Sequence, residues 1–179
     1  MKDKNDNIEA AHQIIISLGL PRAQQNERSA LSLLALLNLT PGKAWAQAEN
    51  PLVGITPIMD WAREHYGKEY APNTRETFRR QTMHQFCDAG VALYNPDKPD
   101  RPVNSPKAVY QVEPAALKLL RSFGSDQWHD NLTTYLSERE TLVAKYAMER
   151  EQSRIPVEIA PGKAITLSPG HHSELIRAI

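Results

Sequence analysis

The side chains best suited to chemistry gather in one run near the middle of the chain, from residue 73 to 86. Within it, arginines stand among short polar side chains and a histidine: Asn73, Thr74, Arg75, Thr77, Arg79, Arg80, Gln81 and His84. An arginine guanidinium is planar and carries several N–H groups, so it matches phosphate oxygens and the acceptor edge of guanine. The run therefore has the composition of a surface that contacts nucleic acid.

The same run has the pattern of an amphipathic helix. Phe78, Thr82, Phe86 and Ala89 recur at helical spacing and predict a buried stripe, while most of the basic side chains fall off it. Asn73 is a favourable N-cap residue, and we expect its side chain to accept an N–H of the first turn. A solvated surface helix is the alternative, although such a helix more often mixes Lys and Glu four residues apart.

Another helix is predicted just before this one. Thr56 as N-cap and Pro57 as first helical residue indicate its start, and Gly67 indicates its end. Its inner face is expected at Ile58, Trp61, Ala62 and His65. A short connector, 68–72, leads to the arginine-rich run. Two helices joined by a short turn, the second basic and polar, are typical of a helix-turn-helix, whose second helix enters the DNA major groove.

A β-hairpin is predicted directly after the arginine-rich helix. Residues 91–94 and 108–112 have the composition of two short strands, and prolines at 96, 99, 102 and 106 exclude regular structure between them. A hairpin in this position is a wing. It carries donors suited to phosphate or minor-groove contacts: Lys98, Arg101, Asn104, Ser105 and Lys107. A proline-stiffened surface loop with incidental charge is the alternative.

Further helices are predicted on both sides of this unit. They fall at 8–18, 27–39, around Trp45, at 114–123, and from a Ser125-Asp126 cap to about residue 152. Leucines cover most of the surface of 27–39, so this helix should be the buried centre. The long last helix suits either a scaffold or half of a dimer interface. The predicted fold is mainly α: a winged helix-turn-helix DNA-binding domain over 1–154, with added N- and C-terminal helices and a small β-hairpin wing.

The chain changes character from residue 155. Two short strands are predicted at 155–159 and 164–167, around a Pro161-Gly162 turn, and a helix at 171–179. The chain stops inside that helix with an apolar stripe that has little to pack on. We therefore expect 155–179 to be the start of a truncated domain.

Composition restricts the class of protein further. The chain has 179 residues, and its 21 basic and 21 acidic residues cancel, so any nucleic-acid surface must be local. The single cysteine, Cys87, cannot form an internal disulfide and is expected as a small buried hydrophobe. Neither a signal peptide nor a segment long enough to span a bilayer is predicted, which favours a soluble protein of the cytoplasm.

The common metal-dependent nuclease site is not predicted in this chain. That site needs an Asp and a Glu/Asp-x-Lys triplet, and no lysine here has Asp or Glu two places before it. Asp97 and Asp100 are therefore interpreted as loop turns. His171 and His172 are adjacent on a helix and face different directions, which disfavours a metal site. We predict no catalytic residue, metal ligand or cofactor site in these residues.

Five ordered blocks carry a family resemblance: Asn26–Leu31, Gly54–Asp60, Ala71–Thr82, Arg101–Pro106 and Leu167–His171. Together they resemble the N-terminal portion of the BsuBI/PstI-type restriction endonucleases, over roughly residues 8–179. The resemblance implies a type II enzyme that cuts a palindromic hexamer, CTGCAG for the name-giving members, with Mg²⁺. It also implies an N-terminal helix-turn-helix domain, with the catalytic domain following the last block.

On this resemblance, residues 1–154 bind double-stranded DNA and 155–179 open a truncated nuclease domain. The catalytic residues and the Mg²⁺ site are then expected outside this chain. A palindromic target mirrors a two-fold protein, so the full-length enzyme is expected as a homodimer. Two other functions stay open: a winged-helix protein-interaction module, which suits the zero net charge, and a transcription regulator.

Overall fold

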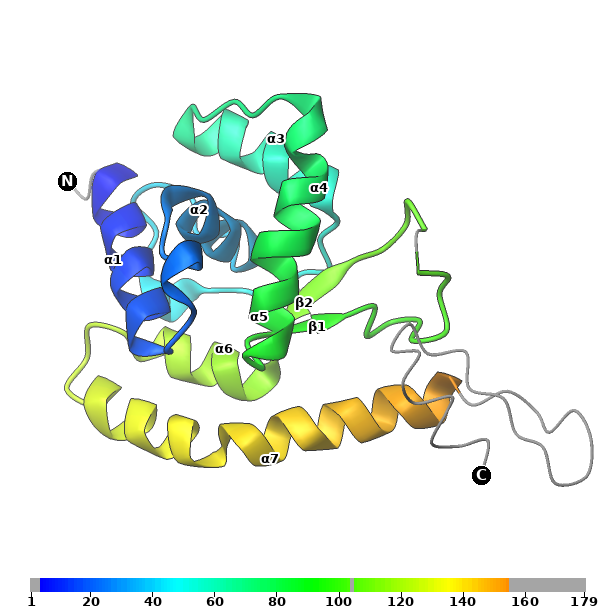
Figure 1. Ribbon diagram of the computed structural model, residues 1–179. Coiled ribbons are helices and arrows are strands. Elements are labelled where there is room, and N and C mark those ends of the chain that lie inside the picture. The colour runs from blue at the N-terminus through cyan, green and yellow to red at the C-terminus, as the bar shows by residue number, and fades with distance from the viewer. Residues whose placement is uncertain (1–3, 104, 155–179) are drawn as a thin grey trace, which may run out of the picture.

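The computed structural model describes residues 4–103 and 105–154, which form a mainly helical unit with one β-hairpin (Figure 1). The helices are α1 (Lys4–Ser17), α2 (Glu27–Leu36), α3 (Ile55–Tyr66), α4 (Arg75–Thr77), α5 (His84–Asp88), α6 (Pro114–Arg121) and α7 (Trp128–Arg154). The strands are β1 (Ala92–Tyr94) and β2 (Tyr110–Val112). Short 3₁₀ turns are η1 (Arg22–Gln24), η2 (Trp45–Gln47) and η3 (Pro72–Thr74), and η4 (Phe78–Met83) is π-helical. The mainly α prediction is confirmed.

Helix α2 is the buried centre of the fold, as its leucines predict. The side chains at Leu31, Leu33, Leu34, Leu36, Leu37 and Leu39 are each at most 1% exposed. The Asn26 side chain caps the helix by accepting a hydrogen bond from the Ser29 N–H at 2.9 Å. The helix ends at Leu36 instead of residue 39, because Asn38 adopts the left-handed conformation with φ 50°. Helices α1 and α3 both pack against α2.

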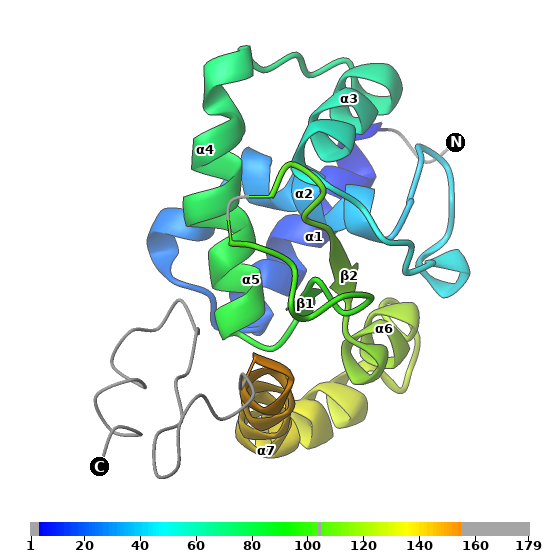
Figure 2. The ribbon, with the colours of Figure 1, turned by 90° about the vertical axis from the view of Figure 1, so that its right-hand side faces the viewer.

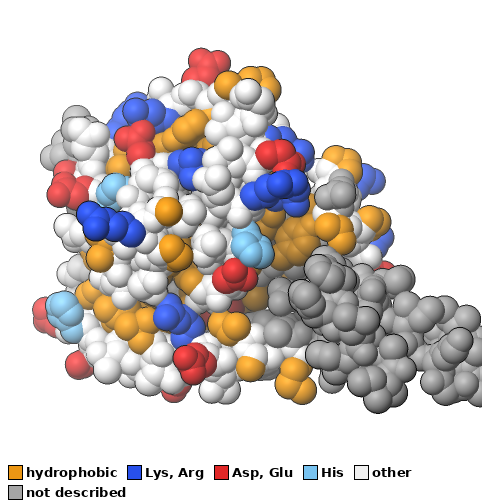
Figure 3. All heavy atoms as spheres, in the orientation of Figure 1, with side chains coloured by type: hydrophobic (Ala, Val, Ile, Leu, Met, Phe, Trp, Pro, Cys, Tyr) orange, Lys and Arg blue, Asp and Glu red, His pale blue; other side chains and the backbone are white. Residues whose placement is uncertain are grey.

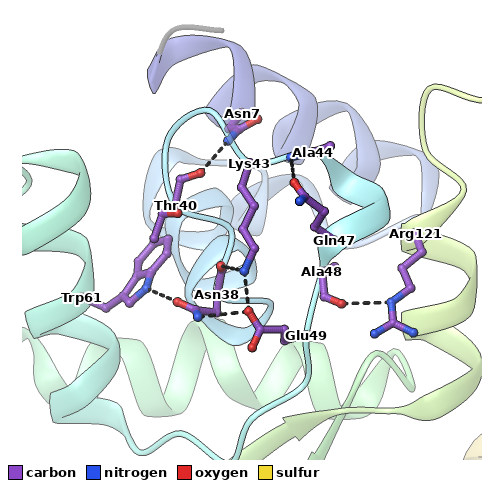
Figure 4. A network of polar contacts seen from close by, with 10 residues as sticks. All are labelled: Asn7, Asn38, Thr40, Lys43, Ala44, Gln47, Ala48, Glu49, Trp61 and Arg121. Carbon is purple, nitrogen blue, oxygen red and sulfur yellow. Dashed lines mark hydrogen bonds and ion pairs between the residues drawn. The ribbon is translucent and has the colours of Figure 1, made fainter.

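A polar network fastens the segment after α2 to α3 (Figure 4). The Asn38 side chain accepts a hydrogen bond from Trp61 Nε1 at 3.0 Å and donates one to Glu49 Oε2 at 3.2 Å. Lys43 forms an ion pair with the same Glu49 oxygen and donates to the Asn38 carbonyl at 3.1 Å. The Lys43 ammonium, with its hydrogen bond, holds the pKa of Glu49 below its usual value. Because Trp61 belongs to α3, the network fixes that helix against the core.

Helices α3 and α4–η4–α5 form the predicted helix-turn-helix, but both predicted N-caps are wrong. Helix α3 begins at Ile55, so Thr56 lies inside its first turn and accepts a hydrogen bond from Arg75 instead. Asn73 lies inside the η3 turn, which begins at Pro72 because proline already has a helical φ. The end of α3 is as predicted, with Gly67 in the left-handed conformation at φ 69°.

The two predicted strands pair as an antiparallel hairpin, which confirms the wing. Ala92 lies opposite Val112, and Tyr94 opposite Tyr110. Val53 forms a further bridge to Tyr110, with hydrogen bonds of 2.9 and 2.8 Å between their backbones. The sequence did not predict this bridge, because a single bridged residue has no alternating pattern. It ties the base of the wing to the chain just before α3.

Helix α7 runs beneath α5 and α6 (Figures 1 and 2) and anchors the unit through its first half. Trp128 and Tyr135 are buried, and the Tyr135 hydroxyl donates to the Gly90 carbonyl at 3.3 Å. Burial raises the pKa of Tyr135 to about 12. Gly90 has φ 78°, and a Cβ there would lie 2.9 Å from Val143, so α7 passes close to the end of α5.

Some predictions fall outside the described residues. They are the strands and the helix predicted in 155–179, and the metal-free interpretation of His171 and His172. The division of the chain at residue 154 therefore stays a prediction.

Candidate nucleic-acid interface

Helices α4, η4 and α5 form one continuous rod that lies beside the hairpin on the outer side of the molecule (Figure 1). The inner side of the rod is apolar: Phe78, Thr82, Met83 and Phe86 are at most 1% exposed. Tyr70, from the connector after α3, packs edge-on against Phe78 with ring centroids 5.0 Å apart. The predicted buried stripe is confirmed, with Ala89 partly buried at its end. Because the stripe faces the core, the arginine flank faces away from it.

The middle of the rod is π-helical, which the sequence did not predict. π-helical turns occur mostly as short insertions and are frequent at functional sites. Here the insertion lets two successive residues, Thr82 and Met83, both enter the core, while Gln81 and His84 on either side are exposed.

Arg28, which was not among the predicted site residues, anchors the rod from α2. Its Nε donates to the buried Thr82 hydroxyl at 2.9 Å, and its Nη2 to Gln81 Oε1 at 3.3 Å. These contacts satisfy the one polar side chain of the buried stripe and hold Gln81 at the surface. The partners are more than fifty positions apart in the sequence, so no local pattern could indicate them.

The exposed flank of the rod carries Arg79 and Arg80, and both bind the same carboxylate. Glu76 accepts hydrogen bonds from Arg79 Nε at 3.3 Å, from Arg79 Nη2 at 2.8 Å and from Arg80 Nε at 3.1 Å. The side chains of Arg79, Arg80 and Glu76 are 31%, 75% and 54% exposed. The hydrogen bond from Arg79 lowers the pKa of Glu76 below its usual value. Each guanidinium keeps N–H groups that Glu76 does not bind, and because the side chains are at the surface these donors can reach a further acceptor.

Arg75 lies near the base of the wing, together with Arg79. The Arg75 Nε donates to the Thr56 hydroxyl at 3.2 Å, which links the rod to α3. Both guanidinium groups interact electrostatically with the buried hydroxyl of Tyr110 on β2, whose burial raises its pKa. The arginine flank of the rod and the hairpin therefore adjoin each other.

The other predicted residues of the rod differ in exposure. Asn73, Gln81 and His84 are exposed, whereas Thr74 and Thr77 are half-buried. His84 Nε2 lies 3.2 Å from a carboxylate oxygen of Asp88, one turn further along. The rod thus presents a mixed polar surface over its whole length.

The wing uses Arg101 differently from the arginines of the rod. Arg101 Nη1 donates to Asn95 Oδ1 at 2.8 Å, and the guanidinium also binds both oxygens of Asp97, at 3.1 and 2.9 Å. Its side chain is only 12% exposed, and Asn95 is fully buried with φ 50°. Asn95 Oδ1 also accepts the Val109 N–H at 2.9 Å. Arg101 therefore braces the hairpin loop from within.

Lys98 and Lys107 are the wing cations that remain exposed. Asn104, another predicted wing residue, lies outside the described residues. Over the face in Figure 3, basic side chains are interspersed with acidic and apolar ones instead of forming a continuous basic area. This distribution agrees with the balanced charge of the sequence.

Residues 4–103 and 105–154 show neither a metal-binding cluster nor a membrane-spanning helix. No group of three or more His, Cys, Asp and Glu side chains in this part of the chain is placed to hold a metal ion. None of the described helices combines the length and apolar character that crossing a membrane requires. Cys87 is partly buried and packs against the core.

Comparisons with known proteins agree with this arrangement. A family model described as the BsuBI/PstI restriction endonuclease HTH domain matches residues 5–144. The chain is 61% identical over 175 residues to the type II restriction enzyme BsuBI of Bacillus subtilis, covering 98% of the chain and 55% of that enzyme. It is 39% identical over 169 residues to the type II restriction enzyme AplI of Arthrospira platensis, covering 94% of the chain and 52% of that enzyme.

A solved structure extends the comparison to the fold. The structure of SdaI restriction endonuclease matches with a TM-score of 0.71 at 34% identity, covering 95% of this chain and 53% of that one. The chain spans about half the length of each of these relatives. The matched range and the sequence identity show that the chain belongs to the BsuBI/PstI restriction endonuclease family. The part of that family it represents is the helix-turn-helix domain, in agreement with its helix order and its wing.

Proposed function

We propose that this chain is the DNA-binding part of a type II restriction endonuclease and binds duplex DNA sequence-specifically through the rod α4–η4–α5. The observation that carries the proposal is the two-sided rod. Phe78 and Phe86 bury one side, and Arg79 and Arg80 extend from the other beside a wing. An α-helix or similar rod fits the major groove, where arginine can bind guanine O6 and N7.

The residues divide into base-reading and backbone-binding groups. Arg75, Arg79 and Arg80 share the guanine edges and nearby phosphates, and the shorter polar side chains make weaker contacts: Asn73, Thr74, Thr77, Gln81 and His84. Lys98 and Lys107 bind the phosphate backbone beside the groove, with Asn104 in the same loop. Arg101 contributes by keeping the loop in shape, since its guanidinium already binds Asn95 and Asp97.

The proposal extends to the whole protein. We propose that the catalytic residues and an Mg²⁺ site of the whole protein lie outside residues 1–154; the coverage of only 55% and 52% of the two type II restriction enzymes is compatible with this. The target is a palindromic hexamer similar to CTGCAG, and its two-fold symmetry calls for a homodimer. The place of action is the cytoplasm, where the DNA to be cut is found.

A salt titration of DNA binding tests the proposal. Fluorescence anisotropy gives the dissociation constants for a CTGCAG duplex, for a scrambled duplex of equal composition and for a pool with randomised centres. We expect preferential binding of one sequence and a log–log salt slope near −4, for about four phosphate contacts. Absence of binding to every duplex at low salt would overturn the proposal.

The mixed charge of the surface in Figure 3 keeps a protein-docking function as the second candidate. A winged helix that docks proteins does not need a DNA-reading flank. If this chain has that function, its DNA affinity should be negligible at any salt concentration. A plasmid assay with Mg²⁺ completes the comparison. We expect this chain to leave supercoiled plasmid intact, and cutting would place catalytic residues within it.

A further inference from the structure

A carboxylate stands among the arginines of the rod, where the proposed function would place DNA. Glu76 is 54% exposed and lies one turn before Arg79 and Arg80. A negative charge close to phosphates is repelled by them, which weakens binding to DNA of any sequence. An acidic residue at this position therefore lowers the affinity for DNA, and this loss needs a compensating contribution to the recognition of a particular DNA sequence.

The hydrogen bonds of Glu76 fix the orientation of the Arg79 guanidinium. Its two oxygens accept Arg79 Nε at 3.3 Å and Nη2 at 2.8 Å, so they hold one side of the guanidinium. These bonds use two of the five N–H groups that an arginine has. The remaining donors, on Nη1 and on the far side of Nη2, lie at the end of the fork. A pair of donors at this end is what bidentate binding of guanine O6 and N7 requires.

Arg80 is held by the same carboxylate through a single bond. Its Nε donates at 3.1 Å to the Glu76 oxygen that also accepts Arg79 Nη2, while the rest of its guanidinium is free of Glu76. One oxygen shared by two guanidinium groups sets their spacing along the rod. Arginine side chains lose much rotational freedom when they bind, and a side chain that is already oriented loses less.

We propose that Glu76 is a specificity-determining residue of the DNA interface. Its charge weakens binding to every duplex, but it orients Arg79 and Arg80 for a matching pair of base edges, so that the gain from orientation is made on the matched duplex alone. This inference rests on the proposed function of the rod. Glu76 acts through the arginines, so it is a positioning residue, and its removal affects the ratio of affinities more than either affinity alone.

The rival interpretation is that Glu76 only stabilises the rod through ion pairs three and four residues apart. Such exposed pairs contribute little to stability and none of their effect depends on DNA sequence. On that interpretation, removal of the charge strengthens binding to matched and scrambled duplexes by the same factor. The two interpretations therefore differ in the ratio of the two dissociation constants.

The test uses Glu76→Gln in the 179-residue chain, with the duplex that the unaltered chain prefers and a scrambled duplex as probes. We expect affinity for the scrambled duplex to rise about threefold, from the lost repulsion. We expect the matched-to-scrambled ratio to fall about tenfold, as for the loss of one good base contact. Glu64→Gln, an equal charge change at an exposed residue of α3, is the control and should leave the ratio unchanged.

A double-mutant cycle shows whether Glu76 acts through Arg79. In the Arg79→Ala background, Glu76→Gln should lower the ratio by much less than in the unaltered chain, since the positioned side chain is gone. An unchanged ratio for Glu76→Gln, or an equal loss in both backgrounds, overturns the inference. Failure of the unaltered chain to bind any duplex would instead overturn the proposed function. Circular dichroism and thermal unfolding of each variant verify that the fold is retained.

Discussion

The rod and the wing both carry an arginine four residues after a carboxylate, yet the two pairs have opposite properties. In the rod, the Arg80 side chain is 75% exposed and its partner Glu76 is 54% exposed. In the wing, the Arg101 side chain is 12% exposed and binds both Asp97 and the buried Asn95. The same spacing thus gives an accessible pair on the proposed DNA-binding surface and a pair that holds a loop together.

Burial explains the difference. An exposed ion pair is surrounded by water, so it contributes little to stability, and the N–H groups outside the pair stay accessible to a phosphate or a base edge. Removing the Arg101 side chain, which is only 12% exposed, takes away the charged donor of Asn95 Oδ1 and leaves it with the Val109 N–H alone. The rod arginines should therefore affect DNA binding without affecting stability, and the wing arginine should affect stability first.

The largest expected effect comes from the rod. Arg79→Ala or Arg80→Ala should weaken binding to the preferred duplex by about 1–3 kcal/mol and reduce discrimination at one base position. The free energy of unfolding should change by less than about 0.5 kcal/mol, as for most surface substitutions. Binding isotherms on matched and scrambled duplexes, with urea unfolding of the same samples, measure both quantities. If these variants lost stability but kept their discrimination between duplexes, the rod arginines would have the same structural role as Arg101, and the proposed difference between rod and wing would be wrong.

The wing should respond in the opposite way. Arg101→Ala should lower the free energy of unfolding measurably, because Asn95 and the loop lose a bound donor. The Val109 amide, which bonds to Asn95, should then exchange its hydrogen faster. Arg101→Lys is the matched variant, since it keeps the charge but cannot bind Asp97 through two N–H groups. If Arg101→Ala kept the stability of the unaltered chain, the contacts of Arg101 with Asn95 and Asp97 would not be needed to hold the loop.

The exposed cations of the wing should have a smaller and sequence-independent effect. Lys98→Ala or Lys107→Ala should weaken binding to all duplexes alike and reduce the log–log salt slope by about 1. Stability should be unchanged, since both side chains are exposed. Anisotropy titrations at several salt concentrations measure the slope. A change confined to the preferred sequence would instead assign these lysines to base reading.

The smallest effect concerns pH. Hydrogen bonding to Arg101 holds the pKa of Asp97 below its usual value. A carboxyl whose pKa is lowered in the folded state stabilises the fold above its unfolded pKa of about 3.9, and this contribution disappears as pH falls through the lowered value. The difference in thermal midpoint between the unaltered chain and Asp97→Asn should therefore shrink as pH falls below about 4. A constant difference in thermal midpoint over this pH range would show that the ionised Asp97 carboxylate is not the source of the stabilisation.

The sequence predicted the features of the fold that depend on neighbouring residues. The buried stripe through Phe78 and Phe86 has helical spacing, and Gly67 ends α3 because glycine adopts a positive φ without strain. The two strands and the proline-rich loop between them were likewise predicted from local composition. Local patterns of this kind need no knowledge of distant contacts.

The predicted N-cap at Asn73 is displaced by the neighbouring Pro72, and several other wrong or missing predictions involve contacts between distant parts of the chain. Thr56 has the side chain of a good N-cap, but its hydroxyl is used by Arg75 from the next helix. The anchoring of the rod by Arg28 and the pairing of Val53 with Tyr110 join segments far apart in sequence. The inward orientation of Arg101 depends on the buried Asn95, whose conformation the sequence does not reveal.

The central claim is that the rod arginines read guanine in the major groove. The most direct measurement compares the preferred duplex with copies in which single guanines are replaced by 7-deazaguanine, which lacks the N7 acceptor. At least one replacement should weaken DNA binding by the unaltered chain by about 1–3 kcal/mol, and the same replacement should have little effect on binding by Arg79→Ala or Arg80→Ala. Equal binding of all copies by the unaltered chain would contradict the central claim.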